Sequence, residues 1–366
     1  MAPSRVPADL SAGLADPASR SASPGFAASL LIVRDGEPLR EERVNASERS
    51  LFCAFSAGKP ITAVAVHLLA ERGALSLDDP ISRHWPGYAV HGKQTVTIRD
   101  VLTHRSPAPN STGSVLGDLR IVADWGASVG AAERARPLAR RWTAERPWYH
   151  ALSFGFLLGE VVERVAGEPL TSFVSRELFA PLGMRDSFLR LPRERADDAV
   201  ELISRGPLER IRRNVFNRTE VRAALAPAAS LHTTARDLAR FYAMLLRGGR
   251  NAEGERVLRP ETVLATRALA HDRRFDRGML YRARWGTGFE LGFPGRGLAF
   301  GDRTSTAAFG HNGSNICLAW ADPGEDLVFV YLSNLAEKRL RARRYLSGLS
   351  DAARDLTSGA ARTAPG

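Results

Sequence analysis

A serine and a lysine one helical turn apart are the residues best suited to chemistry in this chain. Ser56 and Lys59 stand in the segment FSAGKP (55–60), which leads into an apolar run that we expect to be helical. Residues three positions apart share one face of a helix, so the Lys59 nitrogen can reach the Ser56 hydroxyl. The positive end of a helix stabilises an alkoxide and lowers the pKa of a nearby lysine. The spacing therefore predicts a serine nucleophile with a lysine base.

The identity of the cation at position 59 supports this interpretation. Only three of the 51 basic residues are lysines, at positions 59, 93 and 338, and all others are arginines. Arginine stays protonated, whereas lysine can serve as a base. The alternative is a surface helix capped by Ser56. That alternative does not explain why the following segment, ITAVAVHLLAERG, has the composition of a protein core.

Two later segments also carry candidate site residues. WYHALSFG (148–155) places Tyr149 and His150 just before an apolar helical pattern, and FGHNGS (309–314) places His311 just before a predicted strand. Asn-Gly is also a strong hairpin signal, so His311 fits either a site or the residue before a turn. His150 fits a substrate pocket or a structural position equally well.

The three segments together resemble the motifs of the serine β-lactamase and penicillin-recognising superfamily, most closely its class C branch with the related DD-peptidases and esterases. Their order and spacing agree with that family, and the resemblance runs from about residue 26 to 335. Further similar segments are LDDP (77–80), VLTHRS (101–106), PAA (227–229) and TARDL (234–238). The resemblance implies an α+β, β-lactamase-like fold: an antiparallel sheet flanked by helices and built from both chain ends, plus a mostly helical lobe. It implies no metal and no organic cofactor.

The resemblance also assigns roles to individual residues. Ser56 matches the acylated nucleophile, Lys59 its base, and Tyr149 the tyrosine that passes a proton to the leaving group. The backbone N–H groups of Ser56 and Ser314 match the oxyanion hole, which stabilises a tetrahedral intermediate. The residues expected to contact substrate are His311, Asn312, Gly313 and His150.

Three departures from the family pattern bear on the substrate. Tyr-x-Asn is replaced by Tyr-His-Ala, which is more similar to the esterase members, and His311 replaces the lysine of Lys-Thr-Gly. SPAP (106–109) stands where Ser-Gly-Leu is usual. We therefore expect an esterase acting on a small-molecule ester or amide. The alternatives are a transacylase that passes the acyl group to an amine or alcohol, and a catalytically silent binding protein.

Another serine pattern points to a different enzyme class. GASVG (126–130) fits the G-x-S-x-G nucleophile elbow of α/β-hydrolases, with Ser128 as nucleophile. The residues after it are highly charged and interrupted by Pro137, whereas an elbow helix is buried. We therefore disfavour Ser128. His67, His104, Cys53 and Cys317 are expected to be structural or are assigned no role.

Hydrophobic periodicity predicts the elements that position these residues. We expect a hairpin over 26–44, helices over 60–73, 151–167, 170–183 and 235–249, strands from about Trp285 that include 316–321 and 327–334, and a helix over 337–356. Strands at both chain ends indicate a sheet-containing lobe of residues 26–80 and 280–358 and a mainly helical lobe of 81–279. Flexible segments are expected over 1–25 and 359–366.

Length and composition limit the remaining function classes. The 366 residues are 44% hydrophobic and 25% charged, which excludes a wholly disordered or coiled-coil chain. The net charge of +11 comes from arginines spread along the sequence, without a nucleic-acid-binding motif. We expect solvated surface charge and no nucleic-acid partner. Because no apolar leader or membrane span is recognisable, we expect a cytoplasmic protein that does not bind membranes.

Overall fold

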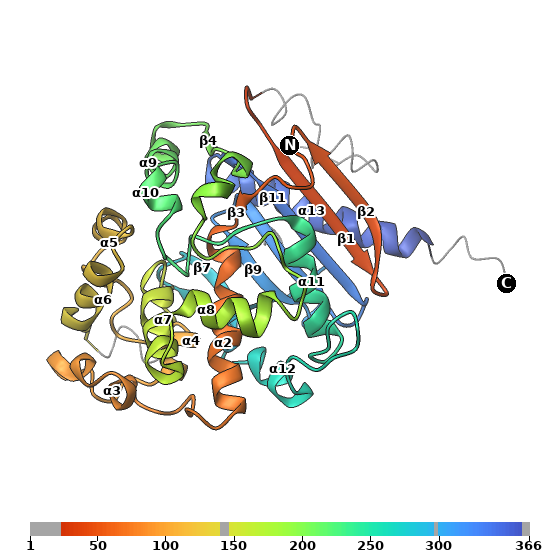
Figure 1. Ribbon diagram of the computed structural model, residues 1–366. Coiled ribbons are helices and arrows are strands. Elements are labelled where there is room, and N and C mark those ends of the chain that lie inside the picture. The colour runs from red at the N-terminus through yellow and green to blue at the C-terminus, as the bar shows by residue number, and fades with distance from the viewer. Residues whose placement is uncertain (1–22, 140–145, 296–298, 361–366) are drawn as a thin grey trace.

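The computed structural model describes residues 23–139, 146–295 and 299–360 (Figure 1). The predicted flexible segments, 1–25 and 359–366, fall outside these ranges except at 23–25 and 359–360. Residues 359 and 360 are the last residues of a helix.

An eight-stranded antiparallel sheet forms the centre of the molecule, in the order β2-β1-β11-β10-β9-β8-β7-β6. Its strands are β1 (Ala28–Arg34), β2 (Glu37–Val44), β6 (His271–Asp276), β7 (Tyr281–Trp285), β8 (Glu290–Leu291), β9 (Phe309–Gly313), β10 (Cys317–Asp322) and β11 (Leu327–Ser333). Two short pairs join β3 (Phe52–Cys53) to β5 (His232–Thr233), and β4 (Ile203–Ser204) to β12 (Leu335–Ala336). β1 pairs with β11, with Leu31 opposite Val330, so both chain ends contribute to one sheet as predicted.

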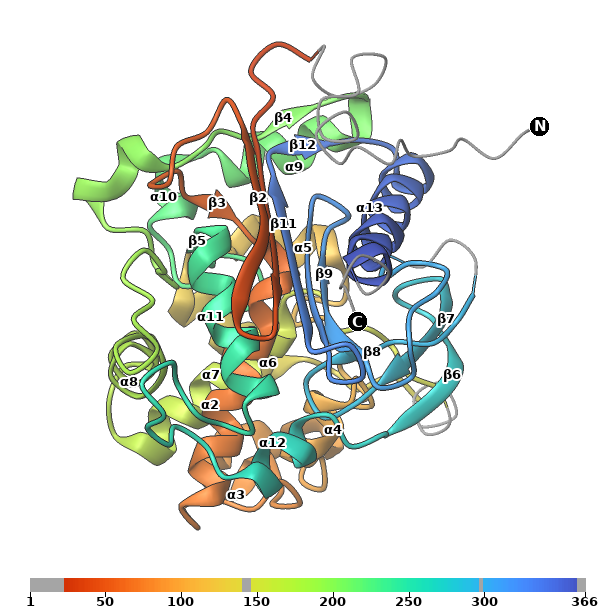
Figure 2. The same cartoon turned by 90° about the vertical axis from the view of Figure 1, so that its right-hand side faces the viewer.

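Helices cover both faces of this sheet (Figure 2). The helical segments are η1 (Phe55–Gly58), α2 (Lys59–Glu71), α3 (Ile81–His84), η2 (Pro86–Gly92), α4 (Ile98–Leu102), α5 (Val115–Ile121), α6 (Trp125–Arg134), α7 (Ser153–Ala166), α8 (Leu170–Val174), η4 (Ser175–Phe179), η5 (Arg193–Asp198), α9 (Pro207–Phe216), α10 (Thr219–Arg222), α11 (Ala235–Leu246), α12 (Pro260–Thr266) and α13 (Arg339–Ala360). α2 and α11 lie on one face and α13 on the other. Alternate residues of β1 enter the two cores: Leu31 faces α2 and α11, and Ile32 faces α13.

The sheet begins earlier in the second half of the chain than the sequence indicated. We predicted strands from about Trp285 and a sheet lobe resuming at residue 280, but β6 already pairs with β7 from His271 onward. The sequence of β6, HDRRFD, is buried only at its two ends and forms the edge of the sheet. An edge strand covered mostly by solvent lacks the apolar alternation that reveals a half-buried strand.

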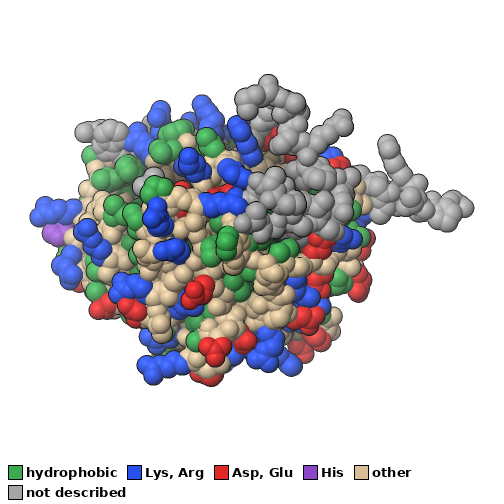
Figure 3. Space-filling model, turned by 90° about the horizontal axis from the view of Figure 1, so that it is seen from above, with side chains coloured by type: hydrophobic (Ala, Val, Ile, Leu, Met, Phe, Trp, Pro, Cys, Tyr) green, Lys and Arg blue, Asp and Glu red, His purple; other side chains and the backbone are tan. Residues whose placement is uncertain are grey.

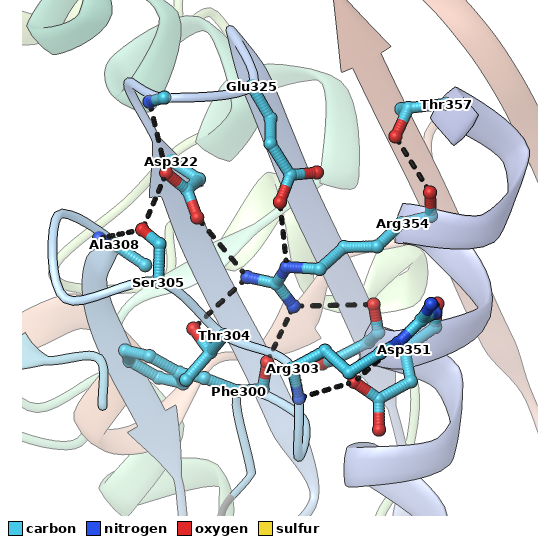
Figure 4. A network of polar contacts seen from close by, with 12 residues as sticks. Phe300, Arg303, Thr304, Ser305, Ala308, Asp322, Glu325, Asp351, Arg354 and Thr357 are labelled. Carbon is cyan, nitrogen blue, oxygen red and sulfur yellow. Dashed lines mark hydrogen bonds and ion pairs between the residues drawn. The ribbon is translucent and has the colours of Figure 1, made fainter. Parts of the chain in front are cut away.

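A buried ion cluster fixes α13 to the sheet (Figure 4). Arg354, with a side chain only 4% exposed, lies 3.6 Å from the fully buried Asp322 and 3.3 Å from Glu325. Its guanidinium also donates to the Phe300 carbonyl at 2.7 Å and lies over the Trp320 ring. The predicted turn between β10 and β11 is thus also the anchor for the C-terminal helix.

Basic side chains are dispersed over the surface drawn in Figure 3. Blue Lys and Arg side chains lie among apolar and acidic ones on that face. Several arginines of the protein form ion pairs, such as Arg195 with Asp186 at 2.7 Å and Arg236 with Glu41 at 2.8 Å. In the described part of the chain, no helix combines the length and apolarity needed to cross a bilayer.

Candidate active site

Ser56 and Lys59 lie where η1 runs into α2, and η1 packs against the interior strands β9 and β10 of the sheet. Ser56 is partly exposed although its neighbours in sequence are buried. The Lys59 Nζ atom is 2.9 Å from the Ser56 Oγ atom, which agrees with the predicted contact. Phe55, directly before the serine, has a left-handed φ of 49°, a conformation that costs energy in a residue with a side chain. The surrounding structure therefore holds Ser56, the predicted nucleophile, in a constrained turn.

Two carbonyl groups from distant segments complete the surroundings of Lys59. Its Nζ atom lies 2.8 Å from the Ala151 oxygen and 3.2 Å from the Ala228 oxygen. Lys59 is wholly buried, and burial lowers its pKa well below the usual value. When Lys59 is neutral, its two N–H groups can serve the two carbonyls and its lone pair can accept the Ser56 proton. This arrangement suits removal of the Ser56 proton.

Tyr149 closes the same cluster. Its ring centroid lies 4.8 Å from Lys59 Nζ, and its hydroxyl is hydrogen-bonded to Ser56. Burial raises the pKa of Tyr149, although the contact with Ser56 opposes this effect. The phenol therefore keeps its proton at neutral pH. The structure brings together the three predicted catalytic residues, from η1, from the start of α2 and from the loop before α7.

An aromatic wall that the sequence did not reveal supports Tyr149. Trp285 stacks on the Tyr149 ring at 5.7 Å with an interplanar angle of 17°, and His104 contacts both rings. Asp276 accepts hydrogen bonds from the Tyr149 backbone N–H at 3.0 Å and from the Trp285 indole at 3.0 Å. His104, which we expect to be structural, accepts the backbone N–H of His150 at 3.2 Å. These residues have no characteristic spacing in the sequence, because β6 and β7 meet the segment of Tyr149 only in the folded protein.

His311 and His150 lie at this wall as neutral imidazoles. Burial, and then the nearby Lys59, lower the pKa of each to about 3. The ring of His311 is 6.0 Å from that of Tyr149. In the described part of the chain, the buried Nε2 atoms of both histidines have no hydrogen-bond partner. Each ring thus brings a polar nitrogen to the site without a fixed positive charge.

The turn after His311 lies two residues later than the Asn-Gly signal suggested. Asn312 and Gly313 belong to β9, whereas Ser314 and Asn315 both have φ of 57° and connect β9 to β10. Asn312 Oδ1 accepts the Asn315 backbone N–H at 2.7 Å and thereby fixes this turn. His311 is consequently within a sheet strand and does not merely precede a turn.

Gly313 allows β9 to lie against the backbone before the nucleophile. A Cβ atom at this position would lie 2.2 Å from the Ala54 carbonyl oxygen. β9 therefore packs closely on η1, and the turn that begins at Ser314 directly follows this contact. This close approach is what an oxyanion hole built from the Ser56 and Ser314 N–H groups requires.

The other candidate residues lie in structural environments. Ser128 is buried inside α6, where its hydroxyl donates to the Ile121 carbonyl at 3.0 Å. Cys53 and Cys317 are buried free thiols, and burial raises the pKa of Cys53 to about 12. His67 bonds the Thr287 carbonyl at 2.9 Å. Across the described ranges, no group of three or more His, Cys, Asp or Glu side chains is arranged to hold a metal.

Comparison with known proteins agrees with this fold. The family model described as Beta-lactamase matches residues 18–352. The chain is 28% identical over 345 residues to Esterase/beta-lactamase LipL of Mycobacterium tuberculosis, covering 84% of this chain and 76% of LipL. Among solved structures, a penicillin-binding protein homolog from Caulobacter crescentus matches with a TM-score of 0.79 at 23% identity, covering 96% of this chain and 98% of that one. A family VIII carboxylesterase matches with a TM-score of 0.80 at 22% identity, covering 95% and 96%. The chain belongs to the β-lactamase family, and the predicted fold is confirmed.

Proposed function

We propose that this protein is a serine esterase that hydrolyses small carboxylic esters through an acyl-enzyme on Ser56. The observation that carries the proposal is the buried Lys59 amine, 2.9 Å from the Ser56 hydroxyl and with two backbone carbonyls for its N–H groups. A base within hydrogen-bond distance of the serine proton, with its pKa lowered by burial, is what nucleophilic catalysis by serine needs.

The same geometry supports a complete reaction. Lys59 takes the Ser56 proton while Ser56 Oγ forms a bond to the ester carbon. The N–H groups of Ser56 and Ser314 stabilise the negative charge that develops on the carbonyl oxygen. As the bond to the alkoxy oxygen breaks, Tyr149 gives its proton to the leaving alcohol, and the protonated Lys59 restores the phenol proton. Water then repeats the sequence on the acyl-enzyme and releases the acid.

The chemistry around this centre favours esters over β-lactams. A lactam carries a carboxylate next to its leaving nitrogen, and an imidazole with a pKa of about 3 offers it no fixed charge at position 311. The curated relative LipL is named an esterase and β-lactamase, and one structural neighbour is named a carboxylesterase. We assign the chain to the class C-like esterase branch on these grounds. Its cytoplasmic location stays a prediction, which fractionation of producing cells tests.

Covalent labelling tests the proposal. We expect 4-nitrophenyl acetate to acetylate the peptide that contains Ser56, and Ser56→Ala to abolish both the adduct and turnover. Ser128→Ala is the matched control, because its hydroxyl is bonded within α6, and it should keep both. An adduct on Ser128 would contradict the mechanism.

The same preparation separates the alternatives. A transacylase would transfer the acyl group to an added amine or alcohol faster than to water, as product analysis shows. Absence of any adduct on the unmodified protein would favour a silent binding protein.

A further inference from the structure

One arginine near the proposed oxyanion hole has no acidic partner. Arg212 of α9 directs its Nη1 atom toward the Ser314 carbonyl oxygen, at 3.4 Å. Burial lowers its pKa, and Glu209, three residues earlier on the same helix, opposes that effect only through space. Among the residues that the structure describes, no carboxylate forms an ion pair with Arg212. Its guanidinium thus has several N–H donors free for a ligand.

Two other arginines whose side chains are mostly covered by the protein pair with carboxylates. The side chain of Arg195 is 17% exposed and contacts Asp186 and Asp198, at 2.7 and 2.6 Å. That of Arg284 is 12% exposed and lies 3.0 Å from Asp272. Removing a cation from water without a counter-ion costs free energy. An arginine that is buried without a counter-ion can recover this free energy by pairing with a carboxylate of a bound ligand.

Packing joins the helix of Arg212 to the turn that holds Ser56. The Phe216 ring at the end of α9 packs edge-to-face on Phe55, with centroids 4.9 Å apart, and Phe55 directly precedes Ser56. α9 therefore rests on the turn that holds the nucleophile. Arg212 and Phe216, four residues apart, share one face of the helix, which explains why the guanidinium reaches Ser314.

β9 and the turn after it thus connect two chemically different ends of the site. At one end His311 contacts Tyr149, where the imidazole is neutral and the phenol is poised to protonate a leaving alcohol. At the other end Ser314 contacts Arg212, which is positively charged. We place the leaving alcohol near Tyr149, which leaves the Arg212 end of the site for the acyl chain.

We propose that Arg212 determines substrate specificity by pairing with a carboxylate on the acyl chain. The preferred substrates are then half-esters of dicarboxylic acids, in which one carboxyl is esterified and the other is free. This proposal rests on the proposed esterase function, and it adds the chemical class of the acyl group. A guanidinium and a carboxylate form a strong, oriented pair when both are shielded from water.

The test compares two 4-nitrophenyl esters of equal chain length, the glutarate half-ester and the neutral pentanoate. We expect the protein to favour the half-ester in kcat/KM. Arg212→Gln should lower the ratio of kcat/KM for the half-ester to kcat/KM for the pentanoate by about 10- to 100-fold, mainly through a higher KM for the half-ester. This range corresponds to the loss of one charge-assisted hydrogen bond. Arg212→Lys should retain part of the preference, because it keeps the charge but loses the planar fork.

A neighbouring arginine supplies the control. Arg213 turns to the side chain of Asn214, so Arg213→Gln makes the same change in net charge and should leave the ratio unchanged. If Arg212 served only to hold Ser314, both esters would lose activity equally and the ratio would stay constant, which would overturn the proposal. The same conclusion follows if the unmodified protein shows no preference.

A third ester locates the carboxylate. In 4-(pentanoyloxy)benzoate the charge lies on the leaving alcohol, and Arg212→Gln should not affect it selectively. A selective loss there would overturn the assignment of Arg212 to the acyl side. Turnover of the neutral ester without a half-ester preference rejects the Arg212 role alone. Turnover of none of the three esters rejects the esterase function and this proposal with it.

Discussion

Lys59 Nζ and Ser56 Oγ lie 2.9 Å apart, with the lysine wholly buried and the serine partly exposed. Burial penalises the charged amine and is the cause of its lowered pKa. We had attributed this effect to the helix N-terminus, but burial accounts for it directly. We therefore expect the proton to leave Ser56 on its buried side, toward Lys59, and an ester to approach the serine from its exposed side.

Replacement of Lys59 by arginine tests this relationship. Arginine stays protonated and cannot take the Ser56 proton, so we expect Lys59→Arg to lower kcat by at least about 10²-fold. Lys338→Arg, at an exposed position, is the matched control and should retain activity. Activity of Lys59→Arg close to that of the unmodified protein would show that Lys59 acts only as a charge.

The pH dependence of kcat/KM follows from the same groups. Activity requires neutral Lys59, so it should fall as the pH drops through the lowered pKa of this lysine. Tyr149, whose pKa is raised, keeps its proton in alkaline solution. His311 and His150, each with a pKa of about 3, do not change charge between pH 5 and 9 in this protein. We therefore expect one acidic limb and a plateau to about pH 9, measured with a neutral ester. A bell-shaped profile centred near pH 7 would contradict this assignment.

The sequence alone supported the fold and the local parts of the site. Ser56 and Lys59 are three residues apart, so helical geometry was sufficient to predict their contact. The apolar β10 and β11 were likewise visible from their composition. These features depend on residues that are close in sequence or on runs of one residue type. They can therefore be predicted without knowing how the chain packs.

The remaining parts of the site depend on packing between distant segments. Asp276 holds Tyr149 and Trp285, but it lies in a charged edge strand that shows no strand pattern. Arg212 lies on a polar helix and is one of many arginines. Its contact with the Ser314 carbonyl, from a helix that packs on Phe55 through Phe216, becomes visible only in the fold. No spacing rule relates residues that meet through separate elements, so these could not be predicted.

Gly313→Ala tests the close approach of β9 to η1. A Cβ atom 2.2 Å from the Ala54 oxygen must push β9 away and displace the Ser314 N–H. We expect kcat to fall by about 10²- to 10³-fold, the scale of losing one oxyanion donor. Gly324→Ala, in the turn after β10, is the control because its Cβ meets no atom closer than 3.4 Å. Equal kcat for the two variants would argue against a Ser314 oxyanion donor.

Arg354→Met tests the anchor of α13. The change leaves Asp322 buried without its cation, which costs about 3–5 kcal/mol in the free energy of unfolding. Arg303→Met removes an arginine that is 51% exposed and pairs with Asp351 and Asp355. It should cost less than about 1 kcal/mol. Urea unfolding measures both, and equal losses would show that the buried cluster adds nothing beyond a surface pair.

His311 determines whether the leaving-group end of the site can hold a carboxylate. The imidazole is neutral at pH 8 because burial and Lys59 keep its pKa at about 3. We expect clear turnover of a neutral ester and slow or absent turnover of a cephalosporin, whose carboxylate lies on the leaving side. His311→Lys introduces a cation there and should raise kcat/KM for the cephalosporin relative to the ester. The new cation lies close to Lys59, so it also lowers the pKa of that base further and preserves its neutral form. Steady-state kinetics of both substrates with both proteins provide the measurement. Efficient cephalosporin turnover by the unmodified protein would replace the esterase assignment with a β-lactamase one, because another cation would then have to hold the carboxylate.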